Sequence, residues 1–191
     1  MSCSNVFTLK GLGMNCDPNL GGIKRAWFGP RDWYDVTPSG DTFYAKITVK
    51  SAYTAQTGTT MKLYEFAKET GSLVTTQVVN EQNGSNYYQN VVNLVFNRME
   101  GWKHLEINAL ANSPVLGVIE DLNGNKWIVG DSTYLSSVGS EIATTGVAND
   151  DRNGYTLALQ ENGTHLPYEL YDSDSILEAS APADGSDPVT Q

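Results

Sequence analysis

The amino-acid sequence predicts a mainly β protein, built as an antiparallel β-sandwich or partly closed barrel with one flanking α-helix and a long projecting hairpin. Aromatic residues make up 10% and charged residues only 18% of the 191 residues, a composition typical of a globular β-rich chain. Alternating polar and apolar residues recur along the chain, and this period of two indicates half-buried strands. Four Asn-Gly pairs, which favour tight turns, separate these runs.

The chain is expected to form one domain with an arm and a tail. Residues 1–20 have little core-forming pattern and are expected to form an N-terminal arm. Residues 21–171 are expected to form the β domain, in which the loop at 51–60 is a second candidate arm. Residues 172–191 are rich in Asp, Ser, Pro and Ala, and we expect an acidic flexible tail there.

The first strand is expected over residues 43–50. Phe43, Ala45, Ile47 and Val49 share one face of this run, while polar residues occupy the other. The run therefore predicts a strand of an antiparallel sheet with one buried face.

A long hairpin is expected next. Strands are predicted over 61–67, 73–80 and 87–97, and Asn83-Gly84 lies between the last two. Arms of roughly eight to eleven residues would be about 27 to 37 Å long, which exceeds the usual strand length of ~5 to 6 residues. We therefore expect the hairpin to project from its domain.

One helix is expected over residues 100–112, ending before Ser113-Pro114. Its predicted buried side chains are Trp102, Leu105 and Ala109, with Ile107 and Leu110 as further candidates. Later strands are predicted over 115–120, 126–130 and 155–160, and residues 132–147 are expected to form a flexible loop.

The charge balance argues against nucleic acid as a tightly bound ligand. Twelve Lys and Arg against 22 Asp and Glu give a net charge of −10, and a phosphate backbone is bound mainly through basic side chains. No apolar run approaches the ~20 residues needed to span a bilayer, so no membrane partner is expected.

The sequence offers no clear cofactor or metal site. Cys3 and Cys16 are interpreted as reduced thiols, with a bridge in an assembled particle left open. Together with His104 and His165 they are too scattered for a structural zinc site. Neither histidine accompanies a recognisable nucleophile motif, so no catalytic residue is assigned.

Two acidic pairs, Glu120-Asp121 and Asp150-Asp151, could in principle serve a glycosidase, but they are interpreted as turn residues. The segment 121–125 has the spacing of a calcium loop. However, Lys126 replaces the required glycine and Ser132 stands where the bidentate glutamate belongs, so calcium is not expected.

An aromatic segment over residues 27–34 is the most suggestive binding feature. Packing in the core and at a subunit interface is the favoured interpretation, with the interface assigned to Trp27, Phe28, Trp33 and Tyr34. The alternative is a carbohydrate-binding β-sandwich module that stacks sugars on Trp27, Trp33 and Tyr34.

Several stretches together resemble a known family. They are residues 21–24 after Cys16, residues 64–66 leading to 79–87, residues 106–110 with 118–127, and residues 153–157 with 166–169. Over most of residues 15–170 the chain resembles the small tail tube proteins of tailed phages and prophages of Bacteroidetes. The aromatic segment 27–34 and the acidic residues after Tyr171 depart from that family.

The resemblance implies a noncatalytic virion protein, made in the cytoplasm of the bacterial host. Its subunits would form hexameric rings that stack into a tube, through which double-stranded DNA passes without specific binding. Tape measure, terminator and connector proteins are the implied partners. Residues facing the lumen would be Thr75, Gln77, Gln89, Asn93 and Asn97. The alternative within this class is another virion component: a tail terminator, a connector or a capsid decoration protein.

Overall fold

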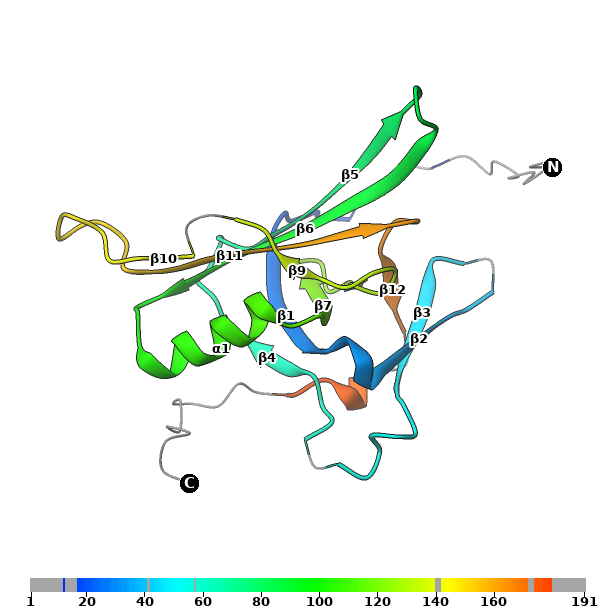
Figure 1. The fold of residues 1–191 in the computed structure, drawn as a ribbon, viewed down its shortest axis with the longest axis horizontal. Coiled ribbons are helices and arrows are strands. Elements are labelled where there is room, and N and C mark those ends of the chain that lie inside the picture. The colour runs from blue at the N-terminus through cyan, green and yellow to red at the C-terminus, as the bar shows by residue number, and fades with distance from the viewer. Residues whose placement is uncertain are drawn as a thin grey trace.

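The computed structural model describes residue 12 and residues 17–40, 42–56, 58–139, 142–171 and 174–179. This part of the chain is mainly β, and two sheets face one another with a single helix beside them (Figure 1). The prediction of a β-sandwich with a flanking helix is confirmed. The described strands close no barrel, because each sheet retains two edges.

The larger sheet has seven strands. In order across the sheet they are β2 (Tyr34–Pro38), β3 (Tyr44–Val49), β12 (Tyr168–Leu170), β8 (Lys126–Val129), β7 (Val115–Asp121), β1 (Ile23–Pro30) and β4 (Lys62–Tyr64). Neighbouring strands run antiparallel, except that β12 pairs with β3 in parallel. A short 3-10 turn, η1 (Arg31–Trp33), joins β1 to β2.

The smaller sheet has five strands. Four of them follow the order β10 (Ala143–Thr144), β11 (Gly154–Gly163), β6 (Ser85–Asn97) and β5 (Ser72–Asn80), while β9 (Ser136–Ser137) also pairs with β11. The predicted hairpin is therefore present as β5 and β6, joined by a turn in which Gly84 has a φ of 69°. Its tip extends beyond the rest of the molecule (Figure 1).

The main core lies between the two sheets. Apolar residues of β6 and β11, such as Leu94 and Leu157, pack there against Phe28 and Ile119 of the larger sheet. All four side chains are at most 2% exposed. This alternation of buried and accessible residues is the pattern from which the sequence predicted β6 and β11.

A second core covers the opposite face of the seven-stranded sheet. Trp27, Leu116 and Ile128 point into it, so these strands are buried on both faces. In β7 six consecutive residues are buried. Burial on both faces removes the polar–apolar alternation, so β7 was predicted from its continuous apolar run alone. The aromatic residues of β1 were interpreted as packing and interface residues, and β1 was not predicted as a strand.

The helix α1 (Gly101–Asn112) flanks the main core at the end of the sandwich where β10 begins. Its buried side chains are Ile107 and Leu110. The predicted stripe was wrong at Leu105, which is 54% exposed, and at Ala109, which is also exposed. At twelve residues α1 is too short for a bilayer, and the described residues include no helix that could cross one.

The C-terminal segment departs from its prediction. Residues 174–179 are described, and they dock against the seven-stranded sheet through the turn η2 (Asp174–Ile176) and Glu178. We call residues 174–178 the strap. Met61 N donates to Ile176 O and Glu178 N donates to Met61 O, at 2.7 and 3.0 Å. The expected tail boundary at residue 172 is therefore too early. Residues 172–173 and 180–191 lie outside the described residues.

Two other expectations change in internal loops, at 132–147 and 51–60. The predicted loop at 132–147 contains β9 and β10, both of which pair with β11. Of the predicted arms, the loop at 51–60 is anchored by Tyr34, whose hydroxyl donates to Thr59 O at 2.9 Å. Most of the expected N-terminal arm, including Cys3 and Cys16, lies outside the described residues.

Candidate assembly site

The β5–β6 hairpin has two unlike faces. The turn pairs Asn80 with Ser85, so odd-numbered residues of β5 share a face with even-numbered residues of β6. One face, which carries Leu73 opposite Val92, points toward the seven-stranded sheet. We call the opposite side of the five-stranded sheet the outer face.

The outer face consists of uncharged residues. Cross-strand pairing assigns to it Ser72, Val74, Thr76, Val78 and Asn80 of β5, Tyr87, Gln89, Val91, Asn93, Val95 and Asn97 of β6, and Thr156, Ala158, Gln160 and Asn162 of β11. One basic side chain reaches its margin, since Arg152 donates to Thr156 Oγ1 at 2.5 Å. This strip of amides, hydroxyls and small apolar groups offers little attraction to a polyanion.

The residues expected to face a lumen do not share one face. Gln89, Asn93 and Asn97 lie on the outer face. Thr75 pairs with Asn90 and Gln77 pairs with Tyr88, so these two belong to the inner side. The prediction that these five residues share one face is therefore wrong at Thr75 and Gln77, because the sequence does not define the register across the turn.

Strand β5 is a free edge. It pairs with β6 over nine residues and with no other described strand. Its sequence, SLVTTQVVN, contains no charge and no proline, the usual devices by which edge strands resist pairing with other chains. By contrast, the strap covers the β4 edge of the larger sheet, where Glu178 Oε2 accepts from Leu63 N at 3.3 Å. The long β5 edge is thus open to another strand.

Three of the four aromatic residues assigned to a subunit interface lie inside the chain's own core. Trp27 is 3%, Phe28 2% and Tyr34 0% exposed. Burial raises the pKa of the Tyr34 phenol to about 12. Only Trp33 is partly accessible, and it stacks on Tyr53 with 5.7 Å between ring centroids. The interface assignment is wrong for the buried three, and the sugar-stacking platform of the alternative interpretation is absent from them.

A buried polar cluster lies beneath the hairpin. Glu161 of β11 is 1% exposed, and its carboxylate accepts hydrogen bonds from Asn90 Nδ2, Gly130 N and Ser132 N at 3.1, 2.8 and 2.9 Å. Asn90 Oδ1 in turn accepts from Thr75 Oγ1 at 2.8 Å. These bonds satisfy a carboxylate that would otherwise be costly to bury, and they connect β5, β6 and β11 to the loop after β8.

Asp131 and His165 extend this cluster toward solvent. His165 Nε2 lies 3.4 Å from Asp131 Oδ2 and 3.1 Å from Ser132 Oγ, and its Nδ1 lies 2.8 Å from Leu166 O. Burial raises the pKa of Asp131, and the charge of Glu161 adds to this effect, while His165 opposes it. Serine and aspartate meet the same imidazole nitrogen, so the three side chains lack the geometry of a catalytic triad, in which each meets a different nitrogen.

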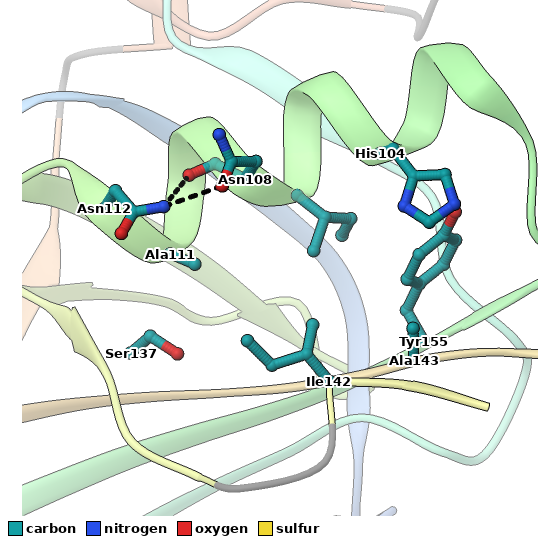
Figure 2. Close-up of a pocket in the computed structure, with 9 residues that line it drawn as sticks. His104, Asn108, Ala111, Asn112, Ser137, Ile142, Ala143 and Tyr155 are labelled. Atoms are coloured by element: carbon teal, nitrogen blue, oxygen red, sulfur yellow. Dashed lines mark hydrogen bonds between the residues drawn. The ribbon is translucent and has the colours of Figure 1, made fainter.

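A shallow cleft of about 330 Å³ lies between α1 and the strands β9 to β11. Ile107, Ile142 and Tyr155 contribute to its lining. Figure 2 shows His104 beside the Tyr155 ring, which it meets edge-on at 5.3 Å between centroids. The Tyr155 hydroxyl is hydrogen-bonded to the backbone of Glu100, at 3.3 Å from both its N and its O. The cleft therefore contains no free acid–base pair.

The candidate calcium segment is held by its own side chains. Asp121 Oδ1 accepts from Asn123 N and Asn125 N at 2.8 and 2.9 Å, and Oδ2 accepts from Trp127 Nε1 at 3.2 Å. This is the arrangement of an Asx turn. In the part of the chain that the structure describes, no three His, Cys, Asp or Glu side chains gather where they could hold a metal ion.

Sequence reasoning missed the cluster of Asp131, Glu161 and His165. The available signal was an acidic residue, Glu161, at an inward position of an otherwise apolar alternation in β11. Its partners lie 29 to 71 residues away in the chain, and no local pattern connects them. Comparison of the chain with protein-family models, with curated proteins and with solved structures gives no match, so its function is inferred from the residues and contacts above.

Proposed function

We propose that the chain is a structural virion protein whose copies form stacked rings, hexameric by analogy with the family it resembles, and that these rings make the tail tube through which phage DNA leaves. The observation that carries this proposal is the uncharged outer face next to a free edge strand. The two features meet on one sheet, which could both line a channel and join its neighbours.

The outer face suits a conduit for double-stranded DNA. A channel wall must let a polyanion slide, and lysine or arginine side chains would hold it by releasing counterions. Gln89, Asn93 and Gln160 present amides at the centre of this face. The net charge of −10 further disfavours tight binding of DNA. DNA would therefore pass without a specific contact.

The free edge suits assembly. In a ring, the β5 edge of one copy would lie beside the β9–β10 side of the next, and pairing there would join the five-stranded sheets around a central axis. Exposed long edges are a liability in a monomer, and a closed ring removes them. Tape measure, terminator and connector proteins are the expected partners at the ends of such a tube. The expected location is the virion tail, after synthesis in the host cytoplasm.

Negative-stain microscopy of the purified protein, combined with its mass by light scattering over a range of concentration and salt, tests the proposal. Stacked rings with a central hole wide enough for double-stranded DNA are the expected result. Single rings that never stack would point instead to a terminator, connector or decoration protein. A strict monomer of 20.8 kDa under every condition would overturn the proposal.

A further inference from the structure

The loop after β8 is attached to the five-stranded sheet by the Glu161 carboxylate, by Thr133 Oγ1, which donates to Asn162 O at 3.4 Å, and by the pairing of β9 with β11. Gly130 N and Ser132 N both donate to Glu161, at 2.8 and 2.9 Å. The residue between these two donors is Asp131, whose side chain is only 9% exposed. A second acid thus lies next to the carboxylate that holds its own loop.

The same carboxylate is connected to the edge strand. Asn90 Nδ2 donates to Glu161 Oε2, and Thr75 Oγ1 donates to Asn90 Oδ1. A change in how Glu161 is held would therefore reach β5 through two hydrogen bonds. Thr76, the next residue along β5, points to the outer face and takes no part in this connection.

Other charged and titratable groups face the cluster from neighbouring elements. His165, in the loop after β11, lies 3.4 Å from Asp131 and packs against the Tyr168 ring at 4.4 Å between centroids. Arg31 of η1 donates to the main-chain oxygen of Asp131 at 3.0 Å. Among the described residues, no basic side chain forms an ion pair with Glu161 itself.

We propose that Asp131, Glu161 and His165 form a proton-controlled latch, which fastens the loop after β8 to the five-stranded sheet more firmly when Asp131 is protonated than when it is ionised. The ligand of this site is a proton. The proposal concerns the isolated chain and holds whether or not copies assemble into rings.

The direction follows from the Asp131 carboxyl, whose pKa is raised in the folded chain by burial and by the charge of Glu161. A carboxyl with a raised pKa binds its proton more tightly when folded, so its stabilising contribution is present at low pH. That contribution is lost as the pH rises from the ordinary value to the raised one. Proton uptake by Asp131 removes the repulsion between the two acids while Glu161 keeps its three N–H donors.

Amide hydrogen exchange at Gly130 and Ser132, corrected for the intrinsic effect of pH, measures the latch directly. We expect protection of both amides to fall as the pH rises from the ordinary aspartate pKa through the raised pKa of Asp131 in the unmodified chain. Each unit by which the pKa of Asp131 in the closed latch exceeds that in the open one changes the opening equilibrium about tenfold. In Asp131→Asn the fall should vanish, and protection at neutral pH should approach the value found in acid.

Matched variants separate the latch from general effects of charge. Asp150→Asn removes the same charge from an exposed loop and should leave the pH dependence intact. Thr75→Val should abolish the pH dependence of β5 amides but preserve it at Gly130 and Ser132, whereas Thr76→Val should change neither.

Two results would overturn the proposal. One is protection at Gly130 and Ser132 that is independent of pH in the unmodified chain. The other is an equal effect of Asp131→Asn and Asp150→Asn. Neither variant alters a core side chain, so the comparison does not depend on a substitution that prevents folding.

Discussion

The indole Nε1 of Trp27 donates a hydrogen bond to the main-chain oxygen of Glu178 across 2.9 Å, although the two residues are 151 positions apart. The Glu178 carboxylate also forms an ion pair with Lys62 at 3.0 Å. An aromatic residue that the sequence assigned to a subunit interface therefore anchors the strap to the chain's own sheet.

Replacing the anchor should loosen the strap. Trp27→Phe retains an aromatic ring but removes the hydrogen bond to Glu178 and part of the buried area. We expect a loss of about 2 kcal/mol in the free energy of unfolding, measured by urea titration, with earlier protease cleavage near residue 178. Trp33→Phe, at a half-buried position, is the matched control. Equal losses in both variants would contradict the anchoring role.

The orientation of α1 can be tested with two leucines. Leu110 is 4% and Leu105 is 54% exposed. Leu110→Ala should cost about 2 to 5 kcal/mol, because it leaves a cavity in the main core. Leu105→Ala should change stability by less than about 0.5 kcal/mol. A larger loss of stability from Leu105→Ala than from Leu110→Ala, measured by thermal or urea unfolding, would show that Leu105 is buried, as the sequence predicts.

A charge on the β5 edge should prevent self-assembly. Val74 is 49% exposed and belongs to the edge strand, and Val74→Lys introduces the kind of residue that blocks edge-to-edge pairing. We expect the variant to remain folded by circular dichroism and monomeric by light scattering. Leu105→Lys, at an exposed position of α1 that lies on neither proposed edge, should assemble as the unmodified chain does. Normal rings from Val74→Lys would exclude β5 from the interface.

Basic residues on the outer face should create affinity for DNA. Gln89→Lys places a cation on this face, whereas Gln77→Lys places the same residue on the inner side of the hairpin. In assembled rings, Gln89→Lys should retain DNA. The slope of the logarithm of the binding constant against the logarithm of the salt concentration should steepen by about one for each phosphate contact. Gln77→Lys should bind less. Equal binding by both variants would show that the lumen is lined by something other than the outer face.

The loop before β11 should loosen in acid. Asp151 Oδ2 accepts from Ala148 N and Val147 N at 2.8 and 2.7 Å, and these bonds lower the pKa of its carboxyl. A lowered pKa means that the contribution of Asp151 to loop stability is present above the ordinary pKa and lost as the pH falls through the lowered one. The amide chemical shifts of the two donors should therefore titrate below the ordinary aspartate value. A midpoint at or above that value would refute this assignment.

The sequence predicted the long strands that have one accessible face, and it predicted β7 from a continuous apolar run. β3, β6 and β11 alternate between buried and accessible residues, and the pattern located each of them within a few positions. β1 and β2 were missed for different reasons: the aromatic residues of β1 were assigned to packing and an interface, and β2 carries a proline and lies at a sheet edge. Two-residue strands such as β9 are too short to show a period.

The candidate site was less accessible to sequence reasoning. Gln89 and Asn93 share one face, as predicted, because β6 itself alternates. Thr75 and Gln77 were placed wrongly, because a face continues from one strand to the next only through the register, and a turn longer or shorter by one residue exchanges the two faces. The polar cluster around Glu161 depends on contacts between distant segments, which composition and spacing do not encode.

The strap also constrains the order in which the chain can fold as it is synthesised. The β5–β6 hairpin is local and is complete once residue 97 has been made, whereas β3 must wait for β12 and Trp27 must wait for Glu178. Local contacts form faster than distant ones, so a nascent chain exposes the β5 edge before the seven-stranded sheet is complete. Successive ribosomes on the same mRNA would thus bring the open β5 edges of several incomplete chains close to one another.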